Sequence, residues 1–219
     1  MFYFKDINGN KVLKSDILDT NSVIHCFTTR GVNANSLYSN YISPQQTHSD
    51  HVEIVDNRLE YPDTDGLIIT KRSIPIALRF ADCTPLIFYD TNLKIGAVAH
   101  AGWRGTAQKI GVKTLQKMYD NFGTKPQDII AIIGPAIGVC CYEVSDEVKD
   151  KVLETVSDKT NLVQGNNIDL KQTNARQLEE FGVTRIDICP YCTSCNNVLF
   201  YSYRKENGTQ NRHYAILML

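Results

Sequence analysis

Residues 97–106, AVAHAGWRGT, hold the pattern that decides the fold, because a strand, a turn and the start of a helix follow one another there. An apolar run ends on His100, and a turn with Gly102 and Gly105 leads into a helical pattern. The carboxyl ends of strands face the crevice where open α/β sheets bind ligands. A glycine turn before a helix leaves backbone N–H groups free for an anion. The stretch therefore predicts an α/β enzyme with its site at this strand end.

Short apolar runs on both sides of this stretch are typical of strands. They lie at Val23–Thr28, Gly66–Thr70, Ile74–Phe80, Leu86–Tyr89, Ile95–Ala99, Ile129–Ile133, Arg185–Ile188, Leu199–Tyr203 and Tyr214–Leu219. Helical patterns are fewer, at Ala107–Phe122, Val144–Val156 and Asp169–Phe181. Since strands outnumber helices and often follow one another directly, we predict a single α/β (α+β) domain over residues 1–219, a mixed-sheet sandwich flanked by helices.

The composition is that of an ordinary globular protein, with 42% hydrophobic and 21% charged residues. A net charge of -1 and scattered Lys and Arg offer no basic patch for nucleic acid. No apolar segment approaches the roughly 20 residues that span a bilayer, and the N-terminus lacks the pattern of a secretory signal. We therefore expect a cytoplasmic protein with neither a nucleic-acid nor a membrane partner.

Seven cysteines without an export signal indicate free thiols rather than a disulfide framework. Cys189, Cys192 and Cys195 have the spacing C-x2-C-x2-C, the most metal-like local pattern in the chain. A bacterial ferredoxin run would need a further cysteine where Leu199 stands, and a structural zinc site would need a ligand from elsewhere. The sequence leaves these thiols open between a metal site and simple packing.

Cys83 and His100 are candidates for one site. Cys83 lies in ADCTP, just after the strand-like run Ile74–Phe80, and His100 follows the run Ile95–Ala99. If these two strands are neighbours in one sheet, the two side chains converge at its edge. With a second histidine, the pair makes a zinc site with an open fourth position. Alone, it makes a thiolate–imidazolium nucleophile.

Two histidines, His48 and His51, lie in QQTHSDHV, ahead of the acidic turn Asp63–Gly66. Three residues apart, they can share one face of a helix and hold one metal ion. Each histidine taken alone is better interpreted as a surface-loop residue.

The segment Ile133–Val144, IGPAIGVCCYEV, leaves a strand through glycine turns and enters a helix. Its adjacent Cys140 and Cys141 cannot usefully bridge each other, and either can line a site or simply pack. Glu143 in the first helical turn complements the helix dipole or serves a site.

Three arginines are candidates for binding a substrate anion. Arg104 follows Trp103 in the glycine turn, where a planar guanidinium beside a helix N-terminus suits phosphate or carboxylate. An arginine stacked over an aromatic ring is the simpler interpretation. Arg204 and Arg212 lie beside strand-like runs, where they either reach a polar substrate or stay solvated.

Taken in order, QTHSDHV, ADCTP, AHAGWRGT, IGPAIGVCCYEV and LFYSYR resemble the YfiH-type family, also called multicopper polyphenol oxidoreductase or laccase-domain proteins. The resemblance runs from about Cys26 to the C-terminus. It implies a mixed α/β sandwich and a zinc ion held by His48, Cys83 and His100. It also implies phosphorolysis of purine nucleosides, with adenosine deamination and phosphorolysis of 5′-methylthioadenosine beside it. Some bacterial relatives are instead named peptidoglycan editing factors.

The copper in the family's label can be compared with the ligands in this chain. A multicopper oxidase needs about ten histidines for its coppers, and this chain has five and no H-x-H pair. A single site of two histidines and a cysteine suits type 1 copper with a long axial methionine. Met1, Met118 and Met218 are poorly placed in the sequence to supply it. Zinc is therefore expected and copper is less favoured.

Two departures from the family pattern concern the substrate more than the zinc. The stretch TTRGVNANSL is shorter than the glycine-rich segment of relatives, although Arg30 keeps the family arginine. A C-terminal T-G-R becomes Gln210-Asn211-Arg212. Of the C-x2-C-x2-C run, only Cys192 falls in the family register, which weakens the case for a second metal.

Three residues are expected to hold the metal and two carboxylates to assist it. His48, Cys83 and His100 would bind zinc, which lowers the pKa of a bound water and so supplies a nucleophile for deamination. Asp82 is expected to orient a histidine or to act as a base. Glu143 is expected to protonate the leaving purine.

A further group of residues is expected to bind phosphate and substrate. Arg104 and the amides around Gly105 and Thr106 would orient phosphate against the ribose C1′, where positioning and electrostatic stabilisation dominate. Arg30 and Arg204 complete this set.

Two alternatives to the phosphorylase stay open. A Cys83–His100 hydrolase would need no metal, so alkylation of Cys83 would abolish its activity and a chelator would not. A non-catalytic zinc-binding module would fill the coordination sphere with protein ligands and show no turnover. The sequence leaves the physiological substrate among adenosine, inosine, methylthioadenosine and a wall precursor, and it does not give the oligomeric state.

Overall fold

The computed structural model describes residues 1–19, 23–58, 60–72 and 74–219. Within these residues, five strands form an antiparallel sheet in the order β1-β2-β3-β13-β6. Their bounds are β1 Phe2–Ile7, β2 Asn10–Ser15, β3 Ile24–Thr28, β6 Ile76–Phe80 and β13 His213–Met218. Asn8 and Gly9, both with positive φ, make the two-residue turn between β1 and β2. An Asn-Gly pair favours this hairpin geometry, yet the sequence prediction lacks the hairpin.

Six further strands in the described part of the chain form a mixed sheet in the order β12-β9-β7-β8-β5-β4. Their bounds are β4 Val52–Ile54, β5 Gly66–Ile69, β7 Thr84–Asp90, β8 Ile95–Ala101, β9 Ile129–Ile133 and β12 Arg185–Ile188. The outer pairs are parallel and the inner pairs are antiparallel. A short hairpin of β10 Val163–Gln164 and β11 Asn167–Ile168 belongs to neither sheet.

The described residues contain α1 Trp103–Ala107, α2 Ile110–Phe122, α3 Asp146–Leu153 and α4 Leu170–Phe181, with short 3-10 turns at Asp16–Leu18, Ala34–Ser36 and Pro126–Asp128. The single helix predicted over residues 107–122 is two helices, because Lys109 has a φ of 58°, a left-handed conformation that an α-helix does not contain. Asp169 caps α4 by accepting a hydrogen bond from the Gln172 amide at 3.0 Å, and Gly182 ends the helix with a φ of 105°. Within the described ranges, none of these helices is long and apolar enough to cross a membrane.

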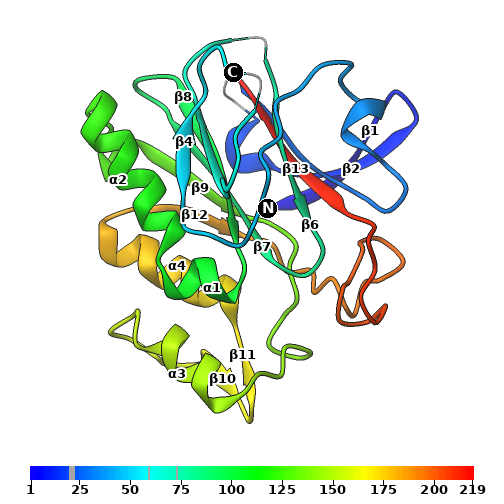
Figure 1. Cartoon of the computed structure of the whole chain (residues 1–219), viewed down its shortest axis with the longest axis vertical. Coiled ribbons are helices and arrows are strands. Elements are labelled where there is room, and N and C mark those ends of the chain that lie inside the picture. The colour runs from blue at the N-terminus through cyan, green and yellow to red at the C-terminus, as the bar shows by residue number, and fades with distance from the viewer. Residues whose placement is uncertain (20–22, 59, 73) are drawn as a thin grey trace.

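The molecule has three layers: the five-stranded sheet, the six-stranded sheet, and α2 with α4 on the outer face of the latter (Figure 1). Successive residues of β8 face opposite sides of its sheet. Val98 packs between the two sheets, whereas Ala97 and Ala99 pack under the helices. Because this sheet is covered on both faces, its central strands are continuous apolar runs. The mixed sandwich predicted from the sequence is confirmed by this arrangement.

One predicted strand is wrong, and one pairing on which an expectation depended is not found. Leu199–Tyr203 is a series of turns, in which the amides of Leu199 and Phe200 both donate to the Asn196 carbonyl. The run that ends at Phe80 is not a sheet neighbour of the run before His100. β6 pairs with β13 in one sheet, and β8 lies between β7 and β5 in the other.

Candidate metal centre and its pocket

The side chains of His48, Cys83 and His100 come together, with one ligand atom of each within 4.8 Å of the others. His48 lies in the loop before β4, Cys83 in the turn between β6 and β7, and His100 near the end of β8. The convergence arises from β7 pairing with β8, in which Pro85 stands opposite His100. Cys83, two residues before Pro85, is thereby held beside the imidazole.

Backbone conformation at this site is unusual. His48 has a φ of 64° and Asp82 a φ of 80°, values that side-chain-bearing residues adopt rarely and that gather at functional sites. Gly102 closes the site from the other side. A Cβ there would lie 2.9 Å from Cys83 Sγ and 3.4 Å from His48 Cδ2. Only glycine leaves room for the ligands at this position.

Asp65 orients His100 and ties it to the loop that carries His48. Its buried carboxylate lies 2.7 Å from His100 Nδ1, which leaves Nε2 as the ring nitrogen for a metal. The other carboxylate oxygen accepts hydrogen bonds from the Thr47 and Ser49 amides at 3.0 and 2.8 Å. The acidic turn that contains Asp65 is visible in the sequence, but the histidine-orienting role was expected of Asp82.

Charges within the site stabilise one another. Burial disfavours the Cys83 thiolate, but attraction to His100 and hydrogen bonds from His100 and His48 together outweigh it and lower the pKa of Cys83 to about 6. Burial likewise disfavours the imidazolium, yet the thiolate and the Asp65 carboxylate raise the pKa of His100 to about 9. Burial of Asp65 is outweighed by its hydrogen bonds, and its pKa falls to about 2. Without a metal, the side chains therefore form a carboxylate–imidazolium–thiolate row.

The donor set fits zinc. Two imidazole nitrogens and a thiolate are ligands that zinc prefers, and catalytic zinc sites have three protein ligands and one open position. A pocket of about 600 Å³ opens directly onto the three side chains. It is lined by Gln46, His48, Arg79, Ala81, Asp82, Cys83, His100, Tyr142, Tyr203, Arg204, Gln210 and Arg212.

Asp82 lines this pocket but bonds to no histidine. One carboxylate oxygen accepts from the Thr193 hydroxyl at 2.6 Å and the other from the Arg204 amide at 2.7 Å. Asp82 therefore does not orient a histidine, because both oxygens hold neighbouring loops. Its alternative role as a base stays a prediction. Arg204 itself lines the pocket, as its expected binding role requires, with its guanidinium 5.3 Å from the centre of the Tyr142 ring.

The expected phosphate site at the start of α1 is not at the pocket. Arg104 is exposed and its guanidinium stacks 4.4 Å from the Trp103 ring, outside the pocket lining. The Thr106 amide donates to the Gly102 carbonyl at 2.8 Å, so it is not free for an anion. Gly105 instead lets the helix approach the strand, since a Cβ there would lie 3.0 Å from the His100 carbonyl oxygen.

Three further candidates lie away from the pocket lining. Arg30 pairs with Glu206 at 2.7 Å and donates to the Asn197 carbonyl, so its guanidinium holds a loop in place. Glu143 is exposed, and only its backbone carbonyl is engaged, by Arg204 at 2.9 Å. His51 is not on a helix with His48 and is not part of the metal-ligand group.

Comparison with known proteins shows the family of the chain. Residues 14–219 match the family model described as multi-copper polyphenol oxidoreductase laccase. The chain belongs to this family. The match confirms the resemblance that the sequence motifs indicated.

The chain is similar in sequence to two relatives and in structure to one solved protein. Purine nucleoside phosphorylase YlmD of Bacillus subtilis (strain 168) is 34% identical over 196 residues, which cover 81% of this chain and 70% of that protein. Purine nucleoside phosphorylase YlmD of Geobacillus stearothermophilus is 37% identical over 164 residues, which cover 71% of this chain but only 60% of that protein. The crystal structure of YlmD from Geobacillus stearothermophilus matches with a TM-score of 0.88 at 26% identity and covers 98% of both chains.

Proposed function

We propose that the protein is a zinc-dependent purine nucleoside phosphorylase. The observation that carries the proposal is the ligand group of His48, Cys83 and His100 at the floor of an arginine-lined pocket. Relatives that are named purine nucleoside phosphorylases support the choice of substrate class. A metal ion held there would supply Lewis acidity next to the bound substrate.

The histidines of this chain favour zinc over the copper of the family description. His25 and His213 are buried in the interior and His51 lies outside the ligand group, so His48 and His100 serve a single ion. Among the described residues no methionine lines the pocket, so the usual axial ligand of a type 1 copper site is missing. The ligands present therefore suit one zinc ion and no multicopper centre.

Phosphate would be held by the three arginines of the pocket. Arg79, Arg204 and Arg212 all line it, and guanidinium groups bind phosphate through charge-assisted, bidentate hydrogen bonds. They replace Arg104 in the role expected from the sequence. In the reaction, a phosphate oxygen bonds to the ribose C1′ while the C–N bond to the purine breaks. The arginines would position the phosphate and neutralise its charge beside that carbon.

Two aromatic side chains give the pocket faces for a purine. Tyr142 is half-buried, and Tyr203 is 53% exposed at the surface. A flat base can stack on such rings. We extend the proposal to phosphorolysis of 5′-methylthioadenosine and to adenosine deamination, in which water adds at C6 and ammonia leaves. The same pocket and ligand group would serve each reaction.

A second candidate function rests on the row formed by Asp65, His100 and Cys83. A carboxylate that orients an imidazole beside a thiolate is the arrangement of a cysteine nucleophile. The lowered pKa of Cys83, about 6, favours the thiolate at neutral pH. This candidate is a cysteine hydrolase that works without metal.

One experiment separates these functions. Purified protein is incubated with adenosine or inosine, with and without phosphate, before and after removal of zinc by a chelator, and the products are separated. We expect phosphate-dependent release of adenine and hypoxanthine, lost on chelation and restored by zinc. Failure of the zinc-loaded protein to release base from either nucleoside would contradict the proposal. Turnover that survives complete removal of metal but not alkylation of Cys83 would establish the hydrolase.

A further inference from the structure

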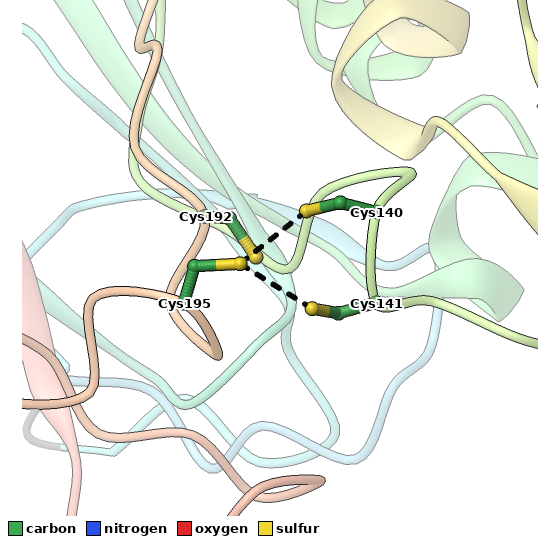
Figure 2. Close-up of side chains that lie close together, drawn as sticks. All are labelled: Cys140, Cys141, Cys192 and Cys195. Atoms are coloured by element: carbon green, nitrogen blue, oxygen red, sulfur yellow. Dashed lines mark hydrogen bonds between the residues drawn. The ribbon is translucent and has the colours of Figure 1, made fainter.

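Four cysteines outside the pocket lining form a second cluster. The Sγ atoms of Cys140, Cys141, Cys192 and Cys195 all lie within 4.8 Å of one another. Cys195 Sγ is 3.5 Å from the sulfurs of both Cys140 and Cys141. Figure 2 shows the four side chains pointing toward a common centre from two different loops. Cys192 is buried, Cys141 is half-buried, and the other two are exposed.

The cluster joins loops that are remote in the sequence. Cys140 and Cys141 lie between β9 and α3, and Cys192 and Cys195 follow β12. Cys189, the first member of the C-x2-C-x2-C run, is not part of the cluster, because its side chain is fully buried in the core between the sheets. The run thus supplies two ligands, and the adjacent pair Cys140–Cys141 supplies the other two that a tetrahedral site needs.

The spacing of the sulfurs suits one tetrahedral ion. Zn–S bonds of about 2.3 Å in a tetrahedron place the sulfurs about 3.8 Å apart. The 3.5 Å separations and the 4.8 Å limit on all pairs bracket this value. An iron–sulfur cluster, with several metal atoms between its cysteines, needs a wider arrangement. Four thiolates without an open position are the ligand set of a structural zinc site.

The surrounding backbone is shaped to the sulfurs. The Gly138 amide donates a hydrogen bond to Cys192 Sγ at 3.2 Å, a contact that stabilises a thiolate. A Cβ at Gly138 would lie 3.4 Å from Cys140 Sγ and 3.6 Å from Cys192 Sγ. A side chain at this position would therefore touch two of the four sulfurs, so the loop packs directly against the cluster.

We propose that Cys140, Cys141, Cys192 and Cys195 bind one structural zinc ion, separate from the ion of the pocket. The two loops that it would join also build the pocket wall. Tyr142 follows Cys141 directly and lines the pocket. Thr193, between the other two ligands, donates its hydroxyl to Asp82 at 2.6 Å. The second ion would thus fix the wall without touching substrate.

The test is the metal content of the whole protein and of variants, measured by elemental mass spectrometry after purification with zinc. We expect two zinc ions per chain in the wild type and one in Cys195→Ser, a variant whose serine side chain is exposed to solvent and disturbs no core packing. Cys83→Ala should also hold one, and the double variant none. Cys189→Ala is the matched control, because it removes a thiol from the same run and should keep both ions.

A spectroscopic readout distinguishes the two sites even where a variant folds poorly. Cobalt bound to four thiolates gives stronger sulfur-to-metal charge-transfer absorption than cobalt bound to one, so Cys83→Ala should retain most of that absorption. Two results would overturn the proposal. One is a Cys195→Ser protein with the full wild-type metal content. The other is a wild-type mass that shows disulfide bonds, or four free metal-less thiols, in the cluster after exposure to zinc.

Discussion

Asp65 is joined to His100 twice: its carboxylate lies 2.7 Å from the Nδ1 atom, and its backbone carbonyl accepts the His100 amide at 2.8 Å. The register of β5 against β8, with Gly66 opposite Ala99, sets this double contact. The orientation of the imidazole is therefore fixed by the sheet itself rather than by a flexible loop.

Asp65→Asn should weaken zinc binding while leaving the fold intact. The amide can keep hydrogen bonds to the loop but loses the charge that makes His100 a stronger ligand, and loss of such a partner typically costs about 10–100-fold in metal affinity. Competition with a chelating dye measures the zinc affinity. Asp63→Asn, in the same turn but without contact to His100, is the control. Equal affinities of the two variants would refute the orienting role.

Gly102→Ala should expel the pocket metal. The added methyl group would stand 2.9 Å from Cys83 Sγ, closer than real carbon–sulfur contacts allow, so the thiol must move. Metal analysis should show loss of one ion, with the other retained. A Gly102→Ala protein with unchanged zinc affinity would show that Cys83 is not a ligand.

Arg212→Gln and Arg204→Gln should raise the KM for phosphate. Each removes a cation that lines the pocket, and a hydrogen bond to a charged group contributes about 1.5–3 kcal/mol, roughly 10–100-fold in binding. Initial rates at varied phosphate and fixed nucleoside provide the measurement. Arg104→Gln is the matched control, because its guanidinium stacks on Trp103 away from the pocket. If the KM for phosphate rises only in Arg104→Gln, the phosphate site lies at Arg104, as the sequence predicted, and not at the pocket arginines.

Stability should fall as the pH drops from about 6.5 toward 4. Burial lowers the pKa of His25 to about 4 and that of His213 to about 3, so these rings stay neutral in the folded protein while the unfolded chain takes up protons. The contribution of the two neutral histidines to stability is fully present above the pKa of histidine in the unfolded chain. Below that pKa, each histidine lowers the free energy of unfolding by about 1.4 kcal/mol per pH unit. Urea unfolding between pH 4.5 and 7.5 gives the free energy of unfolding at each pH. This free energy should change less steeply with pH in His25→Gln, a variant that keeps an acceptor for the Ser15 amide. Parallel curves for the variant and the wild type would contradict this.

Much of the strand pattern was predictable, because strands buried on both faces are visible as apolar runs. Ile129–Ile133 and Arg185–Ile188 have the bounds expected from the sequence. The pairing of the strands was not predictable, because the hydrophobic periodicity of a segment does not indicate which sheet the strand joins. Cys83 and His100 meet as expected, but through β7 rather than through a shared sheet of β6 and β8.

In the candidate sites too, local motifs were predictable and contacts between distant residues were not. His48, Cys83 and His100 stand together as the family motifs implied, whereas Asp65 depended on strand register that no local pattern contains. The cysteine spacing drew attention to the run that starts at Cys189, but local spacing gives no sign of which distant thiols approach it. Arg104 does not reach the pocket, because its guanidinium stacks on the ring of the adjacent Trp103.

The turn that bears Cys83 is also where the chain passes from the five-stranded sheet to the six-stranded one. All three ligands are nevertheless held by the six-stranded sheet, through the β7–β8 pair and through Asp65 just before β5. Partly folded chains with this sheet formed but the other sheet loose would therefore already hold the metal. Capture of the ion is thus an early event in folding, and a refolding chain should withdraw zinc from an indicator before the sandwich has closed.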